Sequence, residues 1–113
     1  MTDQSESTEE AILRDRLVRT WARIEPYTGT ASPHWESATA PLSQQQRIML
    51  SRWLTLFEDE LRLVRGARNE VVASPKGLSK DSLEGAVEVA SELYRLLQEG
   101  LSNPVAPQAI GNW

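Results

Sequence analysis

The sequence has 113 residues, of which 40% are hydrophobic and 25% are charged, so it has room for one domain and one core. It contains no cysteine and one histidine, which excludes zinc fingers, iron–sulfur sites and a thiol nucleophile built from this chain. No apolar run is long enough to span a bilayer, and the first residues are acidic, unlike a signal peptide. We therefore expect a cytoplasmic protein with no membrane segment, metal or cofactor.

The net charge of -4 argues against a generic nucleic-acid binder, but the charges are unevenly distributed. Residues 1–10 hold four acids and no base, and residues 81–101 hold five acids and one arginine. Residues 11–80 therefore carry a net charge of +4. The bases concentrate in the second half of that stretch, at Arg47, Arg52, Arg62, Arg65, Arg68, Lys76 and Lys80. A bound polyanion would be expected there.

Apolar residues recur at helical spacing in three segments, which predict helices over about residues 8–26, 43–72 and 79–101. Each segment begins at a residue that can accept a hydrogen bond from the first turn: Thr8, Ser43 and Ser79. The first segment stops at a proline and the second at the sequence Ser-Pro-Lys-Gly. Residues 27–42, which contain His34 and Trp35, are predicted to form a loop.

The predicted fold class is all-α, a compact antiparallel bundle of three long helices. We expect residues 8–101 to form a single domain, residues 1–7 a flexible N-terminus and residues 102–113 a loose C-terminal tail.

The second predicted helix has two apolar stripes. One consists of Leu50, Leu54, Phe57, Leu61 and Val64, and the other of Met49, Trp53, Leu56 and Leu63. A helix that is apolar on two sides needs two neighbours. Either it packs centrally between the first and third helices, or its second stripe forms a homodimer contact.

The first stripe continues, by steps of four and three residues, to Arg68 and then Val71. A permanently charged guanidinium in line with an apolar seam either extends past the seam to water or is held there for a phosphate or carboxylate.

The residues around Arg68 resemble a known family. Members carry an Arg, usually followed by Asn, Asp or His, then three variable residues and a His, and a further helix follows. Arg68 and Asn69 match this pattern, whereas Ala73 occupies the place of the His. The segment Ala67 to Leu97 thus resembles the C-terminal half of a HEPN domain, the helical fold of many prokaryotic ribonuclease toxins and defence effectors.

The resemblance implies metal-independent RNA cleavage, in which a ribose 2′-hydroxyl attacks the adjacent phosphate. In that reaction the Arg neutralises charge on phosphate and the His moves a proton. The candidate catalytic residues are then Arg68, Asn69 and position 73, with Arg65 and Lys76 as candidate RNA-binding residues. HEPN nucleases face two motifs across a dimer axis, so we expect a homodimer, and a cognate antitoxin or defence-system partner protein.

Ala73 cannot transfer a proton, so the chain as written is expected to be inactive. Either the His was deliberately replaced to disarm a toxic nuclease, or this is a naturally degenerate domain kept for dimerisation or RNA binding. His34, the only imidazole, is most simply a solvated loop residue, although it could replace the missing His in space. The alternative function is a non-catalytic helical interaction module, such as an antitoxin, an adaptor or a nucleotide-sensing domain.

Overall fold

The computed structural model describes residues 2–74 and 76–102, with side chains from residue 8 onward, and over these ranges it contains helices and no strand. The predicted all-α class is therefore confirmed. The elements in chain order are α1 (Thr2–Ile24), the 3-10 helix η1 (Glu25–Tyr27), α2 (Trp35–Thr39), α3 (Gln44–Leu56), α4 (Glu58–Ala73) and α5 (Lys80–Ser102). Most of the predicted loose tail, residues 103–113, lies outside the described residues.

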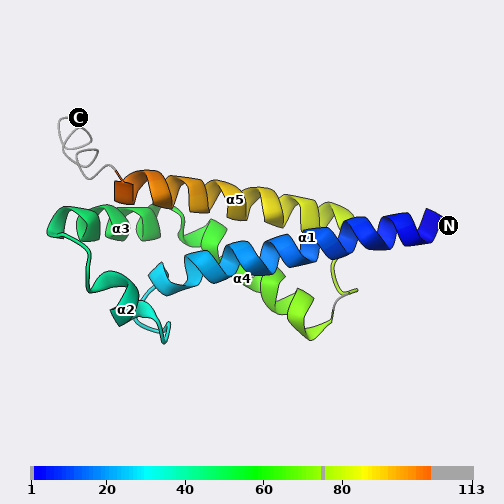
Figure 1. The fold of residues 1–113 in the computed structure, drawn as a ribbon, viewed down its shortest axis with the longest axis horizontal. Helices are drawn as coiled ribbons and strands as arrows, with labels where there is room; N and C mark the ends of the chain where they lie inside the picture. The colour runs from blue at the N-terminus through cyan, green and yellow to red at the C-terminus, as the bar shows by residue number, and fades with distance from the viewer. Residues whose placement is uncertain (1, 75, 103–113) are drawn as a thin grey trace.

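The first and last helices, α1 and α5, lie side by side and run in the same direction (Figure 1). An ion pair joins Glu9 to Lys80 at one end of this pair, and Arg23 lies over the ring of Tyr94 towards the other end. α1 begins at Thr2, six residues earlier than the sequence pattern predicts, and ends at Ile24, just before Pro26. Proline has no backbone N–H to donate, so the helix changes there to the short η1 turn.

The single helix predicted over residues 43–72 is wrong, because two helices meet at Phe57. The backbone of Phe57 has φ -113° and ψ 25°, outside the α-helical region, and it ends α3 and precedes α4. Three acids, Glu58, Asp59 and Glu60, form the first turn of α4, where the positive end of the helix dipole stabilises negative charge. The change of direction at Phe57 lets α3 and α4 contact different parts of α5.

Two predicted N-caps are confirmed. The Ser43 side chain accepts a hydrogen bond from the backbone N–H of Gln46, whose side chain in turn accepts from the Ser43 N–H, forming a capping box. Ser79 accepts a hydrogen bond from the Ser82 N–H at the start of α5. The Gln46 amide also donates to the backbone oxygen of Leu101, a 2.8 Å bond that joins the start of α3 to the end of α5.

The predicted loop over residues 27–42 contains the short helix α2. Arg47 on α3 holds its end: the guanidinium donates to the backbone oxygens of Thr39 at 2.7 Å and Leu42 at 3.2 Å. Thr39 is itself buried. Arg47, one of the bases in the positive stretch, therefore acts here as a structural cap for backbone carbonyls.

The core is centred on α5, which packs against α1, α3 and α4. The central helix is therefore α5 and not the predicted second helix. The buried residues of α5 are Leu83, Ala86, Val87, Ala90, Leu93, Leu97 and Gly100. The second apolar stripe divides between core and surface. Trp53 is buried, but Leu56 is 71% exposed and Leu63 is 53% exposed.

Candidate functional site

Arg68 lies on the buried side of α4, in register with Leu61, Val64 and Val71, which are all buried. The arginine is half-buried, and its Nε atom is buried without a hydrogen-bond acceptor among the described residues. Burying a polar N–H without a partner costs about 1–3 kcal/mol. The position predicted from the stripe is therefore correct, and it leaves part of the guanidinium unsatisfied within this chain.

Asn69 is the hydrogen-bond partner of Arg68. The Nη1 group of Arg68 donates to the Asn69 side-chain oxygen at 3.1 Å. Asn69 is exposed, and its side-chain oxygen accepts this hydrogen bond from the neighbouring arginine. The Asn69 amide thus holds the Arg68 guanidinium beside the buried face of α4.

The other bases near Arg68 have different surroundings. Arg62 pairs with Glu58 at 3.2 Å, and the Arg65 guanidinium lies over the Trp21 ring, 5.8 Å from its centre. Lys76 is exposed. In the part of the chain that the structure describes, no carboxylate oxygen lies within 4.0 Å of a guanidinium nitrogen of Arg68, so Arg68 forms no ion pair there. Its charge is therefore not neutralised by a described acid.

Ala73 is the last residue of α4 and is exposed. It lies five positions after Arg68, which corresponds to about 140° around an α-helix. Because α4 stays helical through Ala73, the helix does not fray to bring the two positions together. Within one chain, Arg68 and position 73 point to different sides of α4.

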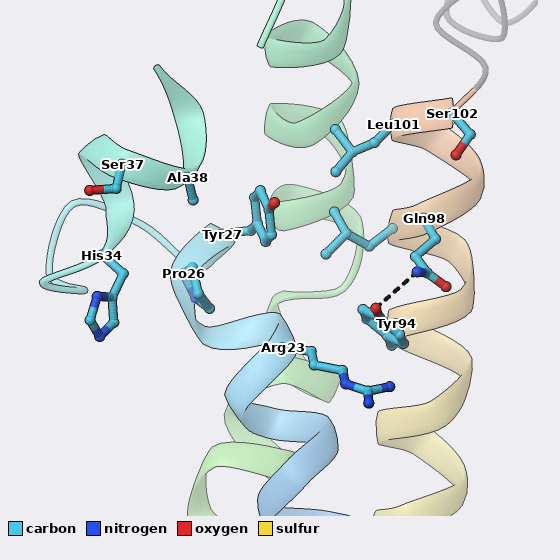
Figure 2. Close-up of a pocket in the computed structure, with 11 residues that line it drawn as sticks. Arg23, Pro26, Tyr27, His34, Ser37, Ala38, Tyr94, Gln98, Leu101 and Ser102 are labelled. Carbon is cyan, nitrogen blue, oxygen red and sulfur yellow. Dashed lines mark hydrogen bonds between the residues drawn. The ribbon is translucent and has the colours of Figure 1, made fainter. Parts of the chain in front are cut away.

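His34 does not join this group. It precedes α2 and, with Arg23 and Tyr27, lines a pocket of about 600 Å³ to which Arg68 does not contribute. The wall on the α5 side includes Tyr94 and Gln98 (Figure 2). Sequence analysis did not identify this pocket. No local pattern in the sequence indicates it, because its lining residues, among them both tyrosines and the single histidine of the chain, come from distant segments.

The described residues contain neither a metal-binding group nor a membrane-spanning helix. The described residues include no group of three or more His, Cys, Asp or Glu side chains placed to hold a metal ion. Among the described helices, none combines the length and apolar character required to cross a membrane.

The sequence matches no protein-family model, no curated protein and no solved structure. The class that the described residues define is that of an all-helical protein.

Proposed function

We propose that this chain is a HEPN-like ribonuclease domain, a toxin or defence effector, in which Ala73 replaces the catalytic histidine. The observation that supports the proposal is the environment of the Arg68 side chain. This side chain lies along a buried seam between Val64 and Val71, forms no ion pair with a carboxylate of the described residues, and keeps a buried Nε without an acceptor. A phosphate that contacts the accessible part of the guanidinium would supply the missing negative charge, because its oxygens match the planar fork of arginine.

The proposed roles follow from the chemistry of each group. Arg68 neutralises charge on the RNA phosphate as the ribose 2′-hydroxyl attacks, and Asn69 steadies the guanidinium through the 3.1 Å contact. Arg65 and Lys76, both exposed, contact neighbouring phosphates. Position 73 would hold the proton-transferring imidazole, so the alanine leaves RNA bound but uncleaved.

A second copy of the chain completes the proposed site. Since Arg68 and position 73 lie on different sides of an intact α4, the two positions would meet across a two-fold axis. The exposed Leu56 and Leu63 on α3 and α4 supply apolar surface for such a contact. In the cell, a cognate antitoxin or another defence protein would restrain the active form.

The test is to build the missing group back. Ala73→His should cleave RNA in excess EDTA, leaving 2′,3′-cyclic phosphate and 5′-hydroxyl ends, because the attacking group is the neighbouring ribose. Adding Arg68→Ala should abolish that cleavage. Val72→His is the matched control: it introduces the same imidazole at the adjacent exposed position, about 100° away around the helix, and should remain inactive.

Each variant is assayed on single-stranded and structured RNA, with circular dichroism to verify folding. Expression in cells provides a second readout that does not depend on the RNA chosen. If folded, dimeric Ala73→His cleaves no RNA and is harmless in cells, the nuclease proposal is rejected.

The second candidate function is a non-catalytic interaction module. It is favoured by the large apolar side chains exposed on α3 and α4, Leu56 and Leu63, which a protein partner would cover. Leu63→Glu should then abolish self-association in analytical ultracentrifugation, whereas Arg62→Glu, at the adjacent exposed position, should not. Self-association without RNA binding by the unchanged chain would favour this function over the nuclease.

A further inference from the structure

The pocket between η1, α2 and the end of α5 has a volume of about 600 Å³, within the range of about 300–1,000 Å³ usual for small-molecule sites. One wall comes from residues 23–38 and the other from residues 94–102, so two distant parts of the chain enclose it (Figure 2). On these grounds the pocket can take a small organic ligand rather than only solvent.

The charged residue that lines this pocket is positive. Arg23 lines it, and no aspartate or glutamate does, although the whole chain has a net charge of -4. Among the described residues, no carboxylate lies within ion-pair distance of the Arg23 guanidinium. An anion entering the pocket would therefore meet an arginine without a competing acid.

Arg23 is also held in place by an aromatic ring. Its guanidinium carbon lies 5.6 Å from the centre of the Tyr94 ring, and the side chain extends from α1 towards α5 (Figure 2). Stacking of this kind leaves the in-plane N–H donors of the guanidinium available. The arginine is thus oriented in advance for a carboxylate or phosphate.

The remaining surfaces suit a flat ring. Gln98 donates a 2.8 Å hydrogen bond to the Tyr94 hydroxyl and so fixes the ring on its wall (Figure 2). Tyr27 faces the same pocket from η1 and is half-buried, with Pro26 and Leu101 adding apolar surface. Aromatic walls stack on planar ligands and favour them over aliphatic ones of equal size.

We infer that this pocket binds a small aromatic anion, a planar ring that carries a carboxylate or phosphate, with Arg23 pairing the anionic group and the two tyrosines contacting the ring. The site lies apart from Arg68, which does not line it, so the inference is independent of the proposed nuclease function.

The test uses three probes with the same ring: 2-naphthoate, 2-naphthyl phosphate and the neutral 2-naphthamide. Binding is measured by isothermal titration calorimetry on the full chain, and ring-proton NMR of Tyr27 and Tyr94 reports the location. At least one anion should bind about 10-fold or more tightly than the amide. The tighter of the two anions identifies the acidic group that the site prefers.

Two variants and one control complete the design. Arg23→Gln should weaken anion binding about 10-fold, and Arg16→Gln, an equal charge change at an exposed position of the same helix outside the pocket, should not. Ala38→Trp, which fills the pocket from α2, should abolish binding of all three probes (Figure 2).

Three results would overturn the inference. They are equal affinity for the amide and both anions, equal effects of Arg23→Gln and Arg16→Gln, and anion binding that occurs only after residues 103–113 are removed. The last result would assign the pocket to that segment of the chain.

Discussion

The indole Nε1 of Trp53 on α3 donates a 3.2 Å hydrogen bond to the backbone oxygen of Leu93 on α5, in the buried interior. This bond joins residues 40 positions apart and fixes how α3 lies against the central helix. It also explains why a tryptophan of the second apolar stripe belongs to the core.

We expect Trp53→Phe to lower the free energy of unfolding by about 1–3 kcal/mol, because it removes the hydrogen bond and leaves a space beside α5. Urea unfolding followed by circular dichroism measures the change. Trp35→Phe removes a half-buried indole outside this contact and should cost less. Equal losses for the two variants would contradict a special role for the bond to Leu93.

Arg68→Met should leave the stability unchanged or raise it by about 0–2 kcal/mol, because the charge lies beside a buried seam without a described acid to pair with. RNA binding, measured by fluorescence anisotropy at fixed salt, should weaken at the same time. Arg62→Met, which breaks an exposed pair with Glu58, is the control for losing one positive charge on α4. A loss of several kcal/mol with RNA binding intact would identify Arg68 as a structural residue instead.

Two glycines of α5 should respond in opposite ways to alanine. A Cβ on Gly85 would meet no atom within 4 Å, so Gly85→Ala should raise the stability by about 0.5–1 kcal/mol through helix propensity. A Cβ on Gly100 would lie 2.8 Å from the Met49 Cγ, so Gly100→Ala should lower it by about 1–3 kcal/mol.

Thermal or urea unfolding of both alanine variants tests this difference. Adding Met49→Ala makes room beside Gly100, so the penalty of Gly100→Ala should shrink in that background. Strict additivity of the two changes would argue against a close approach of α3 to α5 at this point.

Arg95 lowers the pKa of the Glu92 carboxyl below its ordinary value of 4.5, chiefly by a side-chain hydrogen bond and also by its charge. The ionised carboxylate is the stabilised form. The contribution of this pair to the stability of the folded state is therefore present above pH 4.5, and it is lost as the pH falls through the lowered pKa of Glu92 in the folded state.

NMR titration of the Glu92 side chain measures the effect. Arg95→Gln should raise the pKa of Glu92 towards 4.5, and high salt should weaken the shift in the unchanged chain, because both groups are exposed. Arg62→Gln, at a distant exposed pair, should leave the titration as it is. A pKa of Glu92 that does not move in Arg95→Gln would disprove this cause.

Local features of the sequence determined much of the helical structure. Ser43 and Ser79 act as caps because their side chains reach backbone N–H groups only a few residues ahead, whatever the rest of the chain does. The spacing of Leu61, Val64 and Val71 likewise fixes one face of α4, so the position of Arg68 in line with that face was predictable.

Tertiary structure decided the break at Phe57, because it depends on how two successive helices pack on α5. The tertiary structure also decided that no Asp or Glu of the described residues pairs with Arg68, because pairing depends on which distant carboxylates come near. The pocket is the clearest case: Arg23 and Tyr94 are 71 positions apart, and the parallel packing of α1 and α5 brings them together. Periodicity in a sequence specifies which side of a helix is apolar, but not which helix covers it, because that choice rests on packing between segments far apart in the chain.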